Sequence, residues 1–352
     1  MESVKLVEVT RGETVESLHR GVIVVIDSHG KKIASAGDST YYTFIRSAAK
    51  PIQALPVLEK GAAEHFGFSV EEIALIMSSH SGEQGHVHIG LQLMEKIGLE
   101  AKYLQCGTHP PLHKATAKEL ATRGQAPSVF HCTCSGKHAG MLALAKYLKL
   151  SLDDYFQLKH QVQQMMLNTI AELADLNIAS IEVGTDGCGV PVFAMPVERM
   201  AYIYARWANP SDLSVERIKA CNILQEAITT YPEVVAGTGR LASDLMKVTD
   251  KKLLAKDGNE GIFCIGLPSK GWGIAIKIED GNTRAVGPVV IETLRQLGIL
   301  TEDEYKKLSS YSRIELKNYR GELIGEARPV FKLNFKEEEK QKWILQKYSA
   351  RS

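Results

Sequence analysis

The sequence predicts a discontinuous α/β domain that is interrupted by an all-α domain. Short segments rich in Val and Ile come first, helical periodicity dominates residues 69–250, and strand-like segments return after residue 260. This order indicates one sheet that both ends of the chain complete, with a helical insertion between them. We therefore assign residues 1–50 and 255–352 to the α/β domain and residues 51–254 to the helical domain. The active site is expected in the cleft between the two domains.

The first part of the chain combines short strands with turns. Three strands are expected, at residues 4–10, 21–27 and 31–36. From Ser47 onward the apolar residues fall three or four positions apart, which favours a helix. Because Pro51 lacks a backbone N–H, it is tolerated only in the first turn of that helix. The helix is therefore expected to begin at or beside Ser47.

Helical segments separated by loops rich in Gly, Pro and Ser fill the insertion. They are expected over residues 70–79, 88–97, 113–123, 139–148, 152–176, 191–206, 213–230 and 239–247. Strands are then expected at residues 261–266 and 272–279, followed by a helix over 288–297 and a last strand near 330–334. Residues 336–347 are expected to form a charged helix or tail, to which we assign no function.

Composition and charge exclude several classes of protein. The 352 residues include 42 basic and 41 acidic ones, and a net charge of +1 gives no electrostatic basis for binding nucleic acid. The chain has no run of about 18 apolar residues and no apolar leader, so we expect a cytoplasmic protein that does not bind a membrane. Six cysteines in so long a chain do not form a disulfide framework, so reduced thiols or metal ligation are expected.

Ser47 and Lys50 place a nucleophile and its base at the predicted helix start. They are one helical turn apart and therefore share a face of the helix. A serine hydroxyl becomes a strong nucleophile when a neutral lysine takes its proton, and the positive end of a helix favours both the alkoxide and the neutral amine. The same Ser-x-x-Lys spacing occurs at Ser28 and Lys31, among turn-forming residues, so the spacing alone does not establish catalysis.

Two loops hold further reactive side chains. Cys134 lies just before an apolar helix, and Cys188 lies in a distant glycine-rich turn. Together they are candidates for two ligands of a zinc site, although two thiolates fall short of the four ligands that structural zinc takes, and ordinary buried thiols are the alternative. Seven of the eleven histidines fall between His80 and His138, but none has the spacing of a His-Glu-x-x-His zinc helix. We assign no histidine-based zinc site.

Two more polar residues have both structural and chemical interpretations. Ser79 lies in a loop with two other serines, His80 and a glutamate, where N-capping is the structural alternative. Lys256 stands at the entrance of a returning strand, where a solvated lysine is the usual outcome. If that strand joins the N-terminal sheet, Lys256 reaches the cleft where the Ser47 helix begins.

Five motifs together resemble one family. They are residues 46–51 (RSAAKP), 79–83 (SHSGE), 134–140 (CSGKHAG), 186–191 (DGCGVP) and 256–261 (KDGNEG). In this order, along nearly the whole chain, they resemble the Rhizobium-type L-asparaginases, also called asparaginase II or class 3. The resemblance implies a fold similar to that of serine β-lactamases and penicillin-binding proteins. It also implies a homodimer that hydrolyses the side-chain amide of L-asparagine to L-aspartate and ammonia.

The same resemblance implies roles for individual residues. Two Ser-Lys pairs would be catalytic, Ser47 with Lys50 and Ser79 with Lys256. One zinc ion would be held by Cys134, Lys137 and Cys188, with water or substrate completing its shell. Substrate binding would fall to Arg46, His80, His138 and Asp186. These assignments make physical sense, because an amino acid offers a carboxylate to a guanidinium and an ammonium group to a carboxylate.

Two other functions remain as alternatives. A β-lactamase-like amidase or peptidase is disfavoured by the lack of a signal peptide and of Ser-Asp-Asn and Lys-Thr-Gly elements. A non-catalytic, zinc-dependent sensor of an amino acid is disfavoured because all four implied catalytic residues are present. The sequence does not show whether asparagine or glutamine is the preferred substrate, or which serine is the nucleophile. It also leaves open whether zinc takes part in catalysis or only positions the substrate.

Overall fold

The described residues, 2–336 of this computed structural model, divide into two units. Unit 1 comprises residues 2–43, 196–209 and 259–336, and unit 2 comprises residues 44–195 and 210–258. Unit 1 is built on a sheet and unit 2 is mainly helical, so the predicted fold class of α/β plus all-α is confirmed.

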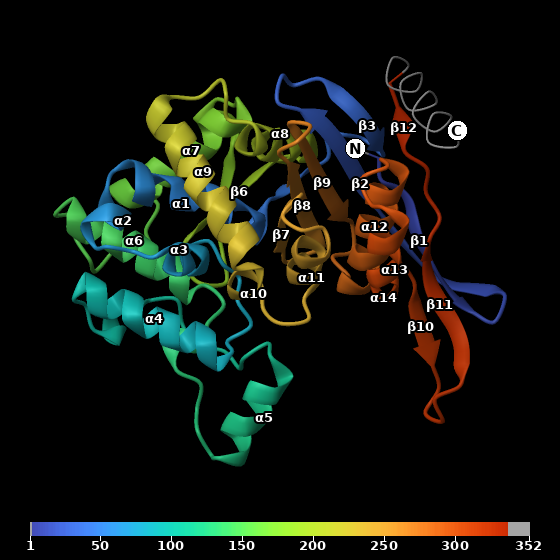
Figure 1. Cartoon of the computed structure of the whole chain (residues 1–352), viewed down its shortest axis with the longest axis horizontal. Coiled ribbons are helices and arrows are strands. Elements are labelled where there is room, and N and C mark those ends of the chain that lie inside the picture. The colour runs from blue at the N-terminus through green and yellow to red at the C-terminus, as the bar shows by residue number, and fades with distance from the viewer. Residues whose placement is uncertain (1, 337–352) are drawn as a thin grey trace. The chain divides into compact units, whose positions relative to one another are not determined.

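Unit 1 is organised around an antiparallel sheet (Figure 1). Its strands are β1 (Val4–Arg11), β2 (Thr14–Asp27), β3 (Lys32–Ala36), β8 (Ile262–Leu267), β9 (Trp272–Ile278), β10 (Ile314–Lys317), β11 (Leu323–Pro329) and β12 (Asn334–Phe335). Six of them follow the order β10, β11, β1, β2, β9, β8, while β3 pairs with β2 and with β12. Strands from both ends of the chain therefore alternate within one sheet.

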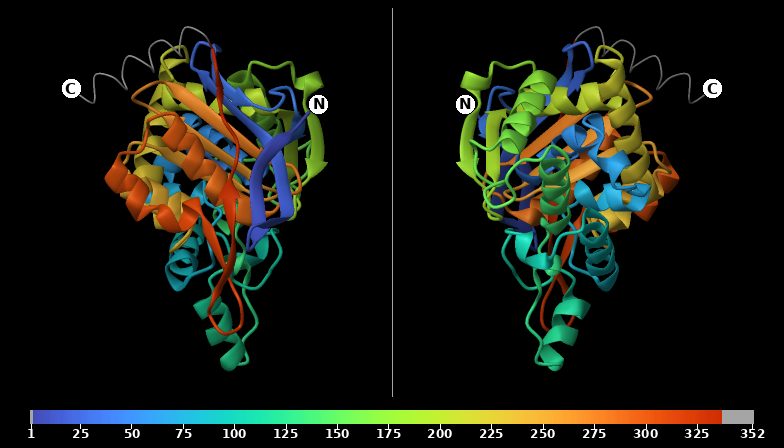
Figure 2. Two further views of the ribbon diagram at one scale, coloured as in Figure 1. Left: turned by 90° about the vertical axis from the view of Figure 1, so that its right-hand side faces the viewer. Right: turned by 90° about the vertical axis from the view of Figure 1, so that its left-hand side faces the viewer.

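Helices of unit 1 pack against this sheet. They are α8 (Val197–Ala208), α12 (Val286–Gln296), α13 (Glu302–Lys307) and α14 (Ser309–Ser312). Helix α8 packs on β2, β8 and β9, and α12 contacts β8, β9 and β11 (Figures 1 and 2). The approach of α8 requires Gly273, because a Cβ there would lie 1.8 Å from the carbonyl oxygen of Ala201. The apolar run in the centre of β2 is buried in the resulting core.

Unit 2 is a bundle of helices with a small sheet. Its helices are α1 (Lys50–Glu59), α2 (Ala62–His65), α3 (Val70–Ile76), α4 (Gln84–Ile97), α5 (Lys114–Thr122), α6 (Ser135–Tyr147), α7 (Gln161–Ala174), α9 (Val215–Thr230), α10 (Pro232–Val235) and α11 (Leu241–Val248). Its strands are β5 (Glu182–Thr185), β6 (Pro191–Pro196) and β7 (Leu254–Gly258), and β4 (Tyr42–Phe44) spans the unit boundary. Helix α6 is buried almost all round, as expected for a helix at the centre of a bundle.

Two predicted helices differ in the structure. The helix expected over 191–206 is wrong in its first third, because Pro191–Pro196 forms β6 and pairs with β5, and α8 begins only at Val197. A short, fully apolar run carries no periodicity that separates a buried strand from a buried helix. The helix expected from residue 152 begins at Gln161, where the His160 side chain accepts a hydrogen bond from the backbone of Val162.

Near the C-terminus, strands β10 and β11 were not predicted. Strand β10 is only four residues long, and β11 mixes charged residues with Gly325 and Pro329, so neither gives an extended alternation or an apolar run. The predicted charged segment 336–347 lies, apart from its first residue, outside the described residues. Within residues 2–336, no helix combines the length and the apolar character needed to cross a membrane.

Candidate active site

Ser47 lies where the structure changes from an extended segment to a helix. Residues Arg46–Ala49 form a 3₁₀ turn that continues directly into α1, and Pro51 falls in the first turn of α1, as predicted. Arg46 adopts the left-handed conformation, with φ of 52°, which is strained for a side chain with a Cβ. The strained turn fixes the direction in which the Ser47 side chain extends from the backbone. Ser28, by contrast, lies in the predicted turn between β2 and β3.

Lys50 is buried and makes three hydrogen bonds. Its Nζ donates to Ser79 Oγ at 2.8 Å, to the Ser78 carbonyl at 2.7 Å and to the Thr133 carbonyl at 3.3 Å. Three acceptors match the three N–H groups of an ammonium ion. The hydrogen bond in the structure thus joins Lys50 to the serine of the other predicted pair.

Lys256 lies on β7 and is fully buried, with its amine bound to the following residue. Its Nζ donates to the carbonyl oxygen and to Oδ1 of Asp257, both at 2.9 Å. Burial, helped by the positive charge of nearby Lys50 and opposed by the negative charge of Asp257, lowers the pKa of Lys256 to about 8. Among residues 2–336, no hydrogen bond joins Lys256 to Ser79, so the second predicted pair remains a prediction.

A small cavity of about 10 Å³ collects several of the predicted residues. Its polar lining residues are Arg46, Ser47, Lys50, Gln53, Lys137 and Asp186. This volume holds about one water molecule. Ser79 is not part of this lining, but its hydroxyl accepts a hydrogen bond from Lys50, which is. Ser47 and Lys50 therefore border the same space, and Ser79 is joined to it through Lys50.

An ion pair borders this cavity. The Arg46 guanidinium donates from Nη2 and Nε to Oδ1 of Asp186, at 3.0 and 3.3 Å. Asp186 begins the turn between β5 and β6, and its backbone N–H donates to the Val190 carbonyl at 2.8 Å. The guanidinium and the carboxylate implied in substrate binding thus satisfy one another in the absence of substrate.

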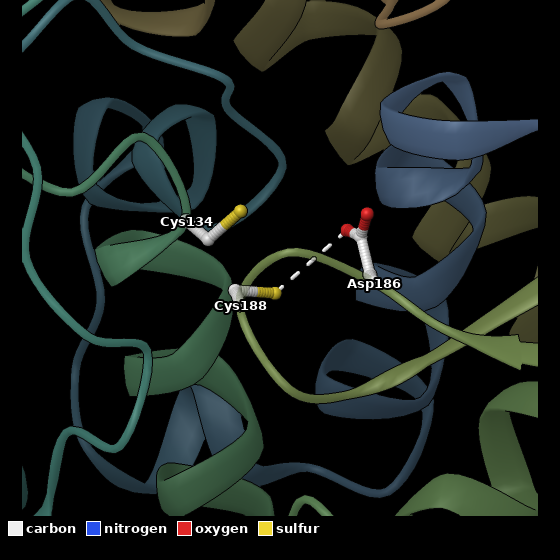
Figure 3. Close-up of side chains that lie close together, drawn as sticks. All are labelled: Cys134, Asp186 and Cys188. Atoms are coloured by element: carbon white, nitrogen blue, oxygen red, sulfur yellow. Dashed lines mark hydrogen bonds between the residues drawn. The ribbon is translucent and has the colours of Figure 1, made fainter.

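Two cysteines and Asp186 form a group suited to a metal ion. Their ligand atoms all lie within 4.8 Å of one another, and Figure 3 shows the sulfur atoms of Cys134 and Cys188 and the carboxylate facing one space. Lys137 Nζ lies 3.2 Å from Cys188 Sγ and 3.8 Å from an oxygen of Asp186. Two thiolates, an amine and a carboxylate are a donor set that fits zinc.

The residues of this group shift one another's pKa values. Hydrogen bonds from the thiols of Cys132 and Cys188 lower the pKa of Cys134 well below its usual range, and Cys134 also caps the start of α6. Burial alone would lower the pKa of Lys137, but the negative charge of Cys134 and Cys188 outweighs burial and raises it. A metal ion bound here would displace the Lys137 proton.

Two buried histidines stand beside these residues. His80 accepts a hydrogen bond from the Gly82 N–H at Nδ1, so Nε2 carries the proton and donates to Ser135 Oγ at 2.9 Å. Burial also lowers the pKa of His80 well below its usual range. With both ring nitrogens bound inside the protein, His80 positions the Ser79 loop in this structure.

His138 differs because one of its ring nitrogens has no partner. Its Nδ1 lies 2.7 Å from Tyr155 Oη, which also accepts the Gln105 N–H at 3.0 Å, while Nε2 is buried and unbonded among the described residues. The fewest polar atoms lack a hydrogen-bonding partner if the Tyr155 hydroxyl donates to Nδ1 of His138 and the ring proton of His138 is on Nε2. Burial, followed by the charge of Lys137, lowers the pKa of His138 to about 3. His138 therefore offers a neutral N–H donor.

Comparison with protein families decides the classification. The L-asparaginase II family matches the chain over residues 7–329. The chain belongs to this family. The resemblance predicted from the five motifs is thereby confirmed. No curated protein matches the chain significantly.

Several solved structures are similar to this asparaginase II family member. They include Mglu (15% identity over 79% of this chain and 60% of that chain, TM-score 0.43), a Bacillus glutaminase (13%, 79% and 91%, 0.37) and a beta-lactamase from Mycobacterium bovis (11%, 83% and 95%, 0.41). The chain thus spans about three fifths of the length of Mglu. These identities and scores are low, and we transfer no residue role from them.

Sequence reasoning missed three residues that support the asparaginase II site. Asp257 binds Lys256 and is itself held by Arg240, whose Nη2 donates to Oδ2 at 2.6 Å. A signal for Asp257 was present, because it directly follows Lys256 in the matched motif. Tyr155 had no such signal, because its segment was predicted as helix and is irregular in the structure.

Proposed function

We propose that this protein is an amidohydrolase, an L-asparaginase that uses Ser47 as its nucleophile. The observation that supports the proposal best is one cavity lined by Ser47, Lys50, Arg46 and Asp186, the last two of which form an ion pair. A nucleophile with its base and a pair of opposite charges is what an amino-acid amide requires. Among the described residues Ser47 Oγ makes no hydrogen bond, which leaves it free for substrate.

The Arg46–Asp186 pair would select a zwitterionic substrate. An α-carboxylate binds a guanidinium with two parallel hydrogen bonds, and an α-ammonium group binds a carboxylate. Substrate entry would therefore exchange one internal ion pair for two ion pairs with the ligand, without leaving a charge unpaired. Amides that lack either charged group would leave one member of the pair unsatisfied, which costs about 1–3 kcal/mol or more for a charged group.

The reaction would proceed in two halves. Lys50 first releases a proton toward Ser79 through their hydrogen bond, and the neutral amine then takes the proton of Ser47 Oγ as that oxygen attacks the carbonyl carbon of the side-chain amide. The C–N bond breaks, and the nitrogen takes a proton and leaves as ammonia. Water then hydrolyses the aspartyl ester, which releases L-aspartate and restores the Ser47 hydroxyl. Backbone N–H groups at the start of α1 would stabilise the oxyanion.

Lys256 would serve as the proton reservoir of the site. With a pKa of about 8 it exchanges protons near neutral pH, whereas an ordinary lysine does not. Its position near Lys50 also disfavours a second positive charge in the same place. Ser79, bonded to Lys50, would relay protons between the lysines and the leaving nitrogen.

We further propose that Cys134, Lys137 and Cys188 hold one zinc ion, and Asp186 lies close enough to join them. When bound, the ion would act as a Lewis acid that polarises a substrate oxygen. Lys137 would become a neutral ligand, and Asp186 would remain available to Arg46 or to the substrate ammonium.

Ammonia release measured with asparagine, glutamine and a β-aspartyl peptide, with and without added zinc, tests the function. Asparagine is expected to be the best substrate, and Ser47→Ala is expected to reduce its turnover by about a thousandfold or more. Ser28→Ala is the matched control, because Ser28 has the same spacing to a lysine but lies in a turn.

Other outcomes of that assay would redirect the proposal. Near-normal turnover by the Ser47→Ala protein, together with loss in Ser79→Ala, would make Ser79 the nucleophile. Binding of asparagine without ammonia release would favour a sensor, and hydrolysis of nitrocefin would favour a β-lactamase-like amidase. The family resemblance also predicts a homodimer, for which light scattering should give twice the chain mass of 38.7 kDa.

A further inference from the structure

Gln53 is a polar residue in an apolar part of α1. The residues around it, from Pro51 to Val57, are otherwise apolar and buried. Gln53 follows Lys50 by three positions, so it lies on the same face of the helix one turn further along. Ser47, Lys50 and Gln53 all line the same cavity. A side chain that carries an amide thus accompanies the proposed nucleophile and base.

The amide of Gln53 has no hydrogen-bonding partner among the described residues. Gln53 as a whole is 3% exposed, and its amide atoms are not among the fully enclosed polar atoms that lack a partner, so they keep a small accessible surface in a residue that lines the cavity. Buried polar groups almost always have a partner, because an unpaired one forfeits its hydration without compensation. The residue faces the cavity, so a molecule in the cavity is the partner that remains.

The charges that line the cavity narrow the choice of partner. Arg46 and Asp186 match the α-carboxylate and the α-ammonium group of an amino acid, and Ser47 must meet the carbon under attack. The neutral carboxamide is the substrate group that Arg46 and Asp186 leave to other partners, and Gln53 is a neutral side chain of the cavity lining that can form hydrogen bonds with it. An amide offers one acceptor and two donors, and the Gln53 amide offers the same set.

We propose that Gln53 recognises the side-chain carboxamide of the substrate and determines specificity for it over a carboxylate. The inference rests on the proposed function and adds a residue to it. The product, L-aspartate, carries a carboxylate that only accepts hydrogen bonds, so the acceptor oxygen of Gln53 faces a second acceptor after the reaction. Gln53 therefore favours binding of the amide and release of the acid.

Binding measurements in a protein that cannot turn over its substrate test this role. Isothermal titration of L-asparagine and L-aspartate into Ser47→Ala gives the ratio of the two dissociation constants without interference from hydrolysis. Adding Gln53→Met keeps the volume and removes the amide, and is expected to weaken asparagine binding about tenfold or more while changing aspartate binding less. Gln53→Glu, which removes the donors and adds charge, is expected to weaken both.

Gln164→Met is the matched control, because Gln164 is a helical glutamine of the same unit that binds the Leu158 carbonyl outside the cavity. An asparagine-to-aspartate ratio that the Gln53→Met substitution leaves unchanged would overturn the inference and leave the proposed function intact. Absence of both asparagine binding and asparagine hydrolysis in the unmutated protein would overturn the two together. Thermal unfolding of each variant shows whether it is folded when titrated.

Discussion

Lys256 is the residue whose proton affinity is most directly set by its neighbours. Its pKa of about 8 results from burial and repulsion by Lys50 and Arg240, which lower the pKa, and from Asp257, which raises it. Asp257 is itself kept ionised, because Lys256 and Arg240 outweigh the burial that would raise its pKa. The balance between three charged neighbours therefore decides whether Lys256 is a base at neutral pH.

Removing a negative charge and removing a positive charge near Lys256 should shift the pH dependence of activity in opposite directions. A base must be unprotonated, so kcat is expected to rise with pH through about 8. Asp257→Asn removes the charge that raises the pKa, which moves this rise to lower pH. Arg240→Gln removes a charge that lowers the pKa, which moves it to higher pH. Initial rates from about pH 6 to about pH 10 check both; shifts of the same sign would contradict this role.

Residue spacing in the sequence grouped Ser47 with Lys50 but did not show all of their contacts. Ser47 and Lys50 share one face of a helix start, as predicted, and both line the cavity. The Lys50 amine nevertheless extends to Ser79, which is in a loop that sequence spacing cannot place. Gln53 has the same three-residue spacing to Lys50, but a lone glutamine in an apolar run suggested no chemistry before the cavity was known.

At the scale of elements, helix α6 connects the metal ligands to the core of unit 2. Cys134 and Lys137 are at its start, while the rest of the helix is buried against α3 and α4. Close contact with α3 requires Gly136, because a Cβ there would lie 2.1 Å from the Leu75 carbonyl oxygen. Such a distance is far below van der Waals contact with a backbone atom that cannot rotate away.

Gly136→Ala should therefore separate α6 from α3. Overpacking of this kind costs about 1–3 kcal/mol of unfolding free energy, and more where only the backbone can move. Gly85→Ala in α4 is the matched control, since nothing lies within 4 Å of its Cβ position and alanine favours the helix. Urea unfolding is expected to show a loss for the first variant and no loss for the second. Equal stability of the two would contradict the close packing.

Element prediction succeeded where periodicity was unambiguous and failed where it was not. The three N-terminal strands and the helices α1, α3 and α9 were all predicted. The apolar run Pro191–Pro196 fits either structure, and only its pairing with β5 makes it a strand. That error matters for the site, because the turn between β5 and β6 carries both Asp186 and Cys188.

At the scale of the whole molecule, every residue assigned to the site belongs to unit 2. A metal that binds the folded unit and not the unfolded chain stabilises it by RT ln(1 + [L]/Kd), which is about 4 kcal/mol at a thousandfold excess over Kd. Zinc added to metal-free protein is therefore expected to raise the midpoint of thermal unfolding. Cys188→Ser, which replaces a soft ligand, should remove most of that rise.

Differential scanning calorimetry with and without zinc, together with metal analysis of the purified protein, checks this prediction. Cys221→Ser is a suitable control, because Cys221 is a buried thiol on α9 outside the metal-binding group. An unfolding midpoint that zinc does not change, in protein that contains no metal, would contradict a zinc site at Cys134 and Cys188.

The distribution of the site along the chain has a consequence for synthesis on the ribosome. Ser47 is made early, whereas Lys256 follows roughly 200 residues later, or about 10–40 s at ordinary rates of elongation. During that interval strands β1 to β3 of unit 1 are also present without β8 and β9, which are made after Lys256. Neither the catalytic group nor the sheet can be completed on a half-made chain. Until then the nascent protein exposes unpaired strand edges, and chaperones that shield such edges should increase the yield of active enzyme.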